Sequence, residues 1–326
     1  MCDETRTPHR REHQPRQAWA RPQRLVQPRP FAVEDGTTGA PDIPVRVLFG
    51  LTRGSEHRHR PPFYVAAPSH QTLILPPPLP FFEDNYLWWL PGTPGPLLVD
   101  PGDAAPALAR FGETPALSAI LLTHHHSDHI GGVAALLERW PGTPVIAPRD
   151  ERIVLANRQV GDGERIEVGG HAFTVMAVPG HTRSHLAYHG DGFVFCGDAL
   201  FSLGCGRMFE GDAPTMLASL DRLAALPDQT AVCCAHEYTL ANAAFAEAVM
   251  ADSPALAERT QEARAQRRAG HPSLPSTIAS ERACNPFLRV DAPEVRAALA
   301  RRLGAAPGTR ADSFAALRRW KDEFRA

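Results

Sequence analysis

Short apolar runs alternate with polar turns from about residue 71 onward. Runs at 72–75, 86–90, 97–99, 119–122, 145–147 and 231–235 predict buried strands. Two longer stretches, 165–178 and 186–196, each break at glycines and therefore predict β-hairpins. Apolar residues recur at helical spacing in 133–140 and 213–226, and we expect only helices from 239 onward. The pattern thus predicts a mixed α/β region followed by an α-helical one.

The first 70 residues differ from the rest of the chain, because proline, arginine and histidine dominate them without a sustained apolar period. Such a composition does not predict a packed core. Two interpretations stay open, a disordered Arg/Pro-rich extension and a start codon assigned too far upstream, whereas a folded accessory domain is disfavoured. We therefore divide the chain into an extension (1–70), a catalytic domain (71–239) and a helical domain (240–326).

Composition and charge narrow the classes of function. The chain has 326 residues and a formal net charge of −2, which argues against a nucleic-acid partner. It has no apolar run long enough to cross a membrane and no signal-peptide core, so we expect a cytoplasmic protein without a membrane partner. The six cysteines form no C-x-x-C pair and suit reduced, buried thiols. We expect a monomer.

A histidine-rich loop follows the strand predicted at 119–122. His124 and His126 are two residues apart and can point the same way, while Asp128 and His129 begin the next turn. Nitrogen and oxygen ligands on one rigid loop can serve two adjacent metal sites. A solvated turn in which Asp128 only caps the following helix is the alternative. The density of imidazoles disfavours that alternative.

Three further polar residues each come directly after a predicted strand: His181, Asp198 and His236. A single histidine in such a place is usually a structural residue. Their order downstream of the H-x-H-x-D-H pattern favours ligation instead, because a common sheet edge would gather the three side chains.

The H-x-H-x-D-H pattern of residues 124–129 resembles the metallo-β-lactamase-like hydrolase superfamily. The resemblance implies an α/β fold in which two sheets are sandwiched between helices, an αββα arrangement. It also implies two divalent metal ions, one on His124, His126 and His181 and the other on Asp128, His129 and His236, with Asp198 between them. Nitrogen and oxygen ligands favour zinc and also admit iron or manganese. We interpret His125 and Asp100 as residues that either support the metal ligands from behind or are structural, and we place His171, His185 and His189 outside the site.

Several segments resemble the glyoxalase II (hydroxyacylglutathione hydrolase) family and together span residue 71 to the C-terminus. They are residues 84–86, 197–201, 204–207, 209–211, 236–239, 275–277, 285–287 and 318–322. The resemblance implies a small α-helical C-terminal domain and a glutathione thioester substrate such as S-D-lactoylglutathione. By position, glutathione would be held by Arg207, Tyr238, Arg318 and Lys321. Arg207 and Phe209 depart from the family, which typically has lysine and tyrosine there.

The chemistry implied by this resemblance is thioester hydrolysis, the second step of methylglyoxal detoxification. A hydroxide formed at the two metals, with Asp128 among the residues that hold it, attacks the thioester carbonyl carbon. The glutathione thiolate leaves readily because its pKa is about 8.5. The sequence offers no convincing Ser-His-Asp triad as a protein nucleophile.

Three other functions compete with hydrolysis. A one-iron persulfide dioxygenase of the same superfamily is disfavoured because Asp128, His129 and His236 supply a second ligand set. A nuclease is disfavoured by the nearly neutral charge. A metal-binding or scaffold protein without catalysis is disfavoured by the intact ligand set.

Overall fold

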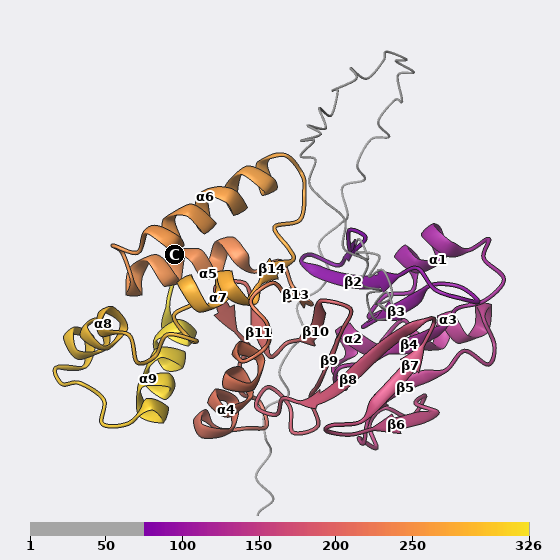
Figure 1. Cartoon of the computed structure of the whole chain (residues 1–326), viewed down its shortest axis with the longest axis horizontal. Helices are drawn as coiled ribbons and strands as arrows, with labels where there is room; N and C mark the ends of the chain where they lie inside the picture. Colours follow the sequence, from indigo (N-terminus) through magenta and orange to yellow (C-terminus); the bar gives the residue numbers. More distant parts are fainter. Residues whose placement is uncertain (1–74, 326) are drawn as a thin grey trace, which may run out of the picture. The chain divides into compact units, whose positions relative to one another are not determined.

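A computed structural model describes residues 75–325 of the chain (Figure 1). Two six-stranded sheets form its centre, in the orders β1-β2-β3-β4-β5-β6 and β14-β13-β10-β9-β8-β7. Side chains of both sheets share one hydrophobic core, in which Trp88 lies 6.4 Å from Phe195 between ring centroids. The expected sandwich of two sheets between helices is therefore present.

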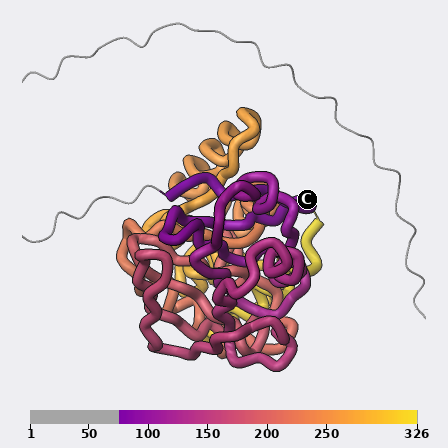
Figure 2. The backbone as a smooth tube through the Cα atoms, turned by 90° about the vertical axis from the view of Figure 1, so that its right-hand side faces the viewer, coloured from indigo at the N-terminus to yellow at the C-terminus, as the bar shows by residue number. Residues whose placement is uncertain are grey.

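The first sheet begins with an antiparallel meander and continues with parallel strands. Its strands are β1 (Leu79–Phe81), β2 (Asn85–Leu90), β3 (Leu97–Val99), β4 (Ala119–Leu121), β5 (Val145–Pro148) and β6 (Arg158–Val160). Helices α1 (Ala105–Phe111) and α3 (Val133–Arg139) cover the outer face through a separate apolar cluster that includes Phe111 and Leu136. Figure 2, turned toward this side, shows the indigo and magenta part of the chain in front.

The second sheet is antiparallel apart from the parallel pair β10 and β13. Its strands are β7 (Arg165–Val168), β8 (His171–Ala177), β9 (Leu186–Gly190), β10 (Phe193–Gly197), β13 (Ala231–Cys234) and β14 (Ser276–Thr277). Both predicted hairpins are confirmed, and each turns where glycines take positive φ, at Gly169, Gly170 and Gly192.

Further helices come after β12 (Gly204–Cys205) in the chain, with β13 and β14 between them, and they include the helix predicted at 213–226. They are α4 (Ala213–Ala224), α5 (Thr239–Val249), α6 (Pro254–Arg268), α7 (Ile278–Cys284), α8 (Pro293–Leu303) and α9 (Arg310–Glu323). Phe245, Phe287 and Phe314 are fully buried and join α5 and α9 to the segment after α7. These aromatic residues belong to the same hydrophobic core as the sandwich, so the helical C-terminal part packs continuously against the sheets.

Two strand predictions need comment. The expectation of helices alone after residue 239 is wrong, because β14 pairs with the outer edge of β13. The reason is tertiary: two polar residues carry no apolar period, and the free edge of β13 supplies the hydrogen bonds. The strand predicted at 72–75 lies outside the described residues except for Leu75, which is in no strand. The first strand of the described residues is β1.

Other features agree with the sequence. The five described cysteines are free and buried. Among the helices of residues 75–325, none combines the length and apolarity that crossing a membrane requires.

Candidate metal centre

The histidine-rich loop between β4 and α3 is bound to the neighbouring strand by a buried carboxylate. Asp100, directly after β3, accepts hydrogen bonds from the Thr123 backbone nitrogen at 2.8 Å and the Thr123 hydroxyl at 2.7 Å. The loop then enters the short helix α2 (Ser127–Ile130). These contacts give the imidazoles of the loop a rigid base and support the interpretation of Asp100 as structural.

Three imidazoles converge to form a first cluster of His124, His126 and His181. His126 Nδ1 lies 3.0 Å from Nε2 of His124 and 3.0 Å from Nε2 of His181. Burial lowers the pKa of His126 to about 4 and that of His124 well below its usual range. Neutral imidazoles that direct their nitrogens at one point form the donor set of a metal site.

A second cluster of Asp128, His129 and His236 lies beside the first. Asp128 Oδ2 is 3.6 Å from His129 Nε2 and 3.5 Å from His236 Nε2. Burial alone would lower the pKa of His129, but the Asp198 and Asp100 carboxylates raise it to about 10. The surroundings therefore favour a positive charge here, which a proton or a metal ion can supply.

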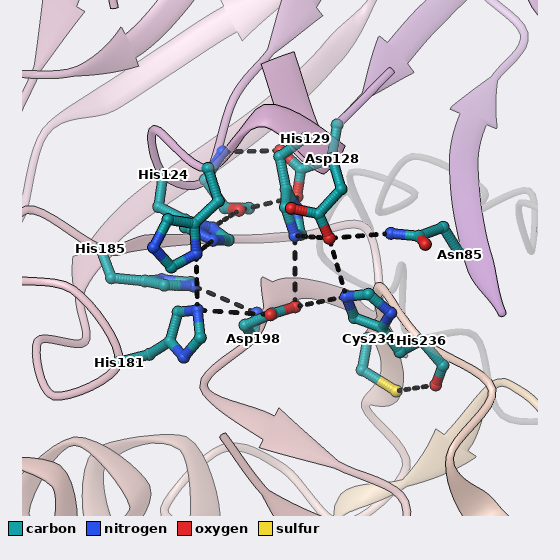
Figure 3. A network of polar contacts seen from close by, with 12 residues as sticks. Asn85, His124, Asp128, His129, His181, His185, Asp198, Cys234 and His236 are labelled. Carbon is teal, nitrogen blue, oxygen red and sulfur yellow. Dashed lines mark hydrogen bonds and ion pairs between the residues drawn. The ribbon is translucent and has the colours of Figure 1, made fainter. Parts of the chain in front are cut away.

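Asp198 lies between the two clusters, as Figure 3 shows. Its Oδ1 is 3.4 Å from His129 Nε2 and 3.3 Å from His236 Nε2, while its Oδ2 is 3.3 Å from His181 Nε2. Asp198 Oδ1 and His129 Nε2 are buried without a hydrogen-bond partner among the described residues. Buried polar atoms without partners are costly, and a cation between them removes that cost. This donor set therefore fits metal ions.

In three of the predicted ligands, the Nδ1 atom on the far side of the ring from the metal site has its own hydrogen-bond partner. His129 Nδ1 lies 3.0 Å from Asp100, His236 Nδ1 lies 2.8 Å from Asp84, and His181 Nδ1 lies 2.8 Å from the Arg207 carbonyl. Such partners accept the ring proton and leave Nε2 free to bind a metal.

His185, predicted to lie outside the site, contacts it instead. Its ring stacks on His124 at 4.6 Å between centroids, and its Nε2 accepts a hydrogen bond from the Asp198 backbone nitrogen at 3.1 Å. The sequence pattern assigned no role to Asp84, which lies behind His236, or to Asn85, which donates to Asp128 Oδ2 at 3.1 Å. No local pattern identifies these contacts, because each joins segments far apart in the sequence.

His125 belongs to neither cluster and lies near two carboxylates instead. Its ring nitrogens lie 3.6 Å from Asp150 Oδ2 and 3.7 Å from Glu210 Oε1. Arg152 joins these two carboxylates through ion pairs. The structural interpretation of His125 is therefore supported.

Comparison with known proteins identifies the family. Residues 86–236 match the model of the metallo-beta-lactamase superfamily, and residues 237–324 match that of the hydroxyacylglutathione hydrolase C-terminus. The hydroxyacylglutathione hydrolase of Xanthomonas axonopodis pv. citri (strain 306) is 57% identical over 252 residues, which cover 76% of this chain and 98% of the relative. The chain belongs to the hydroxyacylglutathione hydrolase family.

A more distant hydroxyacylglutathione hydrolase, from Xylella fastidiosa (strain M23), is 53% identical over 248 residues, covering 76% of this chain and 96% of the relative. Among solved structures, that of ETHE1 from Myxococcus xanthus matches with a TM-score of 0.50 and 26% identity. That match covers 75% of this chain and 91% of the other. The match to this solved structure therefore agrees with the family assignment and with the αββα fold.

A cavity of about 380 Å³ opens beside the two metal-binding clusters. Its lining includes Asp198, His181, Phe201, Cys205, Phe209, Asn242 and all four residues predicted to hold glutathione, Arg207, Tyr238, Arg318 and Lys321. The cavity therefore joins the metal centre to the helical C-terminal domain.

The four predicted residues differ in how free they are to bind a ligand. Arg207 is exposed, and its Nε lies 3.6 Å from Asp322. Tyr238 stacks on His236 at 4.7 Å between centroids. Lys321 is half-buried and donates to the Ala241 carbonyl at 3.0 Å. Arg318 is buried and already donates to the Cys205 carbonyl and to Asp322, so it supports the cavity from beneath.

Replacing Asp84 with alanine should weaken metal binding by about 10- to 100-fold, because His236 loses the acceptor that orients its ring. Competition against a chelator measures this affinity. Glu83→Ala is the matched control, since Glu83 is adjacent and exposed. Equal affinities for the two variants would show that Asp84 does not orient His236.

Proposed function

We propose that the protein hydrolyses S-(2-hydroxyacyl)glutathione, such as S-D-lactoylglutathione, to glutathione and a 2-hydroxy acid. The observation that carries the proposal is the pair of metal-binding clusters joined by Asp198 at one end of a cation-lined cavity. The proposal is also supported by the similarity to hydroxyacylglutathione hydrolases, since the match covers nearly the whole length of those relatives. The reaction would be the second step of methylglyoxal detoxification.

The proposed cofactors are two divalent cations per chain, with zinc favoured by the nitrogen and oxygen donors. The first cluster would hold one cation, the second cluster the other, and Asp198 would offer one oxygen to each. When bound, such cations lower the pKa of water and polarise a carbonyl oxygen. Burial of Asp128 opposes its ionisation, but His236, His129 and Asn85 lower its pKa well below the usual range. Asp128 therefore stays an acceptor that can orient the attacking water.

The cavity suits a thioester of an acidic peptide. Arg207 and Lys321 provide cations for carboxylates, and Tyr238 provides a hydroxyl and an aromatic face next to His236. Phe209 is 63% exposed and lies 5.2 Å from His181 and 5.6 Å from His126 between ring centroids. An apolar ring therefore covers the first cluster on the cavity side, where the family typically has tyrosine.

The second cluster distinguishes hydrolysis from the one-iron oxidoreductase considered above. A one-iron site needs only one set of ligands, whereas Asp128, His129 and His236 form a separate set around Asp198. The net charge of −2 continues to argue against a nucleic-acid partner.

Asp198→Ala should lower the metal content and nearly abolish hydrolysis, because no other carboxylate among the described residues has an oxygen near each cluster. Elemental analysis and a thioesterase assay with S-D-lactoylglutathione measure the two effects. Asp228→Ala, which changes an exposed aspartate paired with Arg282, is the control. One metal per wild-type chain with full activity would contradict the dinuclear proposal.

Lys321→Ala should raise KM for S-D-lactoylglutathione about tenfold or more, since a charge-assisted hydrogen bond contributes about 1.5–3 kcal/mol. The change should fall on KM, because the cation contacts substrate and transition state alike. Burial and Arg318 lower the pKa of Lys321 to about 8, so KM of the wild type should rise as pH increases through that value.

The control for Lys321 is Arg319→Ala, which removes an exposed cation from the same helix. A simple thioester without glutathione carboxylates serves as the second substrate. An equal change in KM for both thioesters would exclude Lys321 from recognition of glutathione.

We also propose that residues 1–70 are dispensable and that the catalytic and helical domains meet near residue 240. The described sheets, clusters and cavity all come from residues 75–325. A chain that begins at Ser69 should keep its kcat, its metal content and its thermal midpoint. If the truncated chain is insoluble or loses its metal, residues 1–70 pack on the catalytic domain and the proposed boundary at residue 70 is wrong.

A further inference from the structure

A small hairpin connects the metal centre to the substrate cavity. Its strands are β11 (Leu200–Phe201) and β12 (Gly204–Cys205), which pair with each other. Asp198 lies two residues before β11 and Arg207 two residues after β12, while Phe201 and Cys205 line the cavity. The position of this hairpin therefore affects both a predicted metal ligand and a predicted substrate residue.

The tip of the hairpin is bound by side chains from the helical part of the chain. Asn285 Nδ2 donates to the carbonyls of Phe201 at 3.2 Å and Gly204 at 2.9 Å. Asn242 Nδ2 donates to the Ser202 carbonyl at 3.0 Å, Arg259 Nη2 donates to the Ser202 hydroxyl at 3.1 Å, and Glu281 Oε2 accepts from the Leu203 nitrogen at 2.8 Å. We call Asn242, Arg259, Glu281 and Asn285 the hairpin socket.

The hairpin socket is buried and internally connected. Glu281 and Asn285 have no exposed surface, and Asn242 and Arg259 are each 5% exposed. Asn285 also donates to Glu281 Oε2 at 2.9 Å. Buried polar groups of this kind stabilise one arrangement, because any shift leaves donors or acceptors without partners. The socket also holds Leu203 at φ +60°, a conformation uncommon for residues other than glycine.

Close packing transmits the position of the hairpin to the metal ligands. A Cβ atom added to Gly206 would lie 1.9 Å from the Asp198 carbonyl oxygen, so the residue directly after β12 lies against the Asp198 backbone. The Arg207 carbonyl next in the chain lies 2.8 Å from His181 Nδ1. A displaced hairpin would therefore move Asp198, His181 and Arg207 together.

We propose that the hairpin socket is a positioning device by which the helical domain sets the geometry of both the metal centre and the substrate cavity. Its four residues touch neither the predicted metal ligands nor, apart from Asn242, the cavity. The inference rests on the proposed function for its kinetic part, whereas its effect on metal affinity does not depend on the substrate.

The test is Asn285→Ala in the full-length protein. We expect metal affinity to fall about tenfold or more, as for residues that orient metal ligands, and KM for S-D-lactoylglutathione to rise. Chelator competition, steady-state kinetics and the thermal midpoint are measured together. Ser313→Ala is the matched control, because Ser313 is equally buried but its hydroxyl donates only to the carbonyl of Thr309, the N-cap residue of α9.

The outcomes separate positioning from stability alone. A lower thermal midpoint with metal affinity and KM unchanged, as expected for Ser313→Ala, would overturn the proposal. If Asn285→Ala does not fold, Ser202→Ala replaces it, since this variant loses only the Arg259 contact, and a smaller change in the same direction is required. A wild type that binds metal but does not cleave S-D-lactoylglutathione would refute the proposed function, and metal affinity would still decide the role of the socket.

Discussion

The buried carboxylate of Asp198 is the interaction on which the rest of this structure depends. An ionised carboxylate removed from water is stable only when opposite charges and hydrogen bonds surround it. Burial opposes the charge of Asp198, but His129 and His236 lower its pKa well below the usual range. The chain segments that follow β4, β8, β10 and β13 must therefore meet at one place, because only together do they stabilise the charge of the Asp198 carboxylate.

The architecture meets that requirement through parallel pairing at the right positions. Strands β3 and β4 run parallel in one sheet and β10 and β13 run parallel in the other, so their carboxyl ends bring Asp100, the histidine-rich loop, Asp198 and His236 together. Asp100 and Asp84 then orient His129 and His236 from behind. A carboxylate behind each of these two imidazoles fixes which nitrogen is free to bind a metal, and this makes the second cluster rigid before any ligand binds.

The helical domain does more than close the cavity. Its side chains satisfy the polar backbone of the β11–β12 hairpin, and its last helix supplies Arg318 and Lys321 to the cavity wall. The same domain thus contacts the substrate side and supports the metal side. This dual contact gives a physical reason for a family in which the sandwich and the helical domain occur in one chain.

The sequence by itself determined the features that depend on local order. Apolar runs and glycine turns predicted both hairpins of the second sheet. Polar residues just past predicted strands indicated the side chains that converge, because strand ends that share a sheet edge bring the following residues together. Tertiary structure alone decided the contacts between distant segments. His185 stacks behind His124, Asp84 lies against His236, and β14 completes a sheet with two polar residues. None of these has a local signal, since each is defined by packing that exists only after both sheets and the helices have assembled.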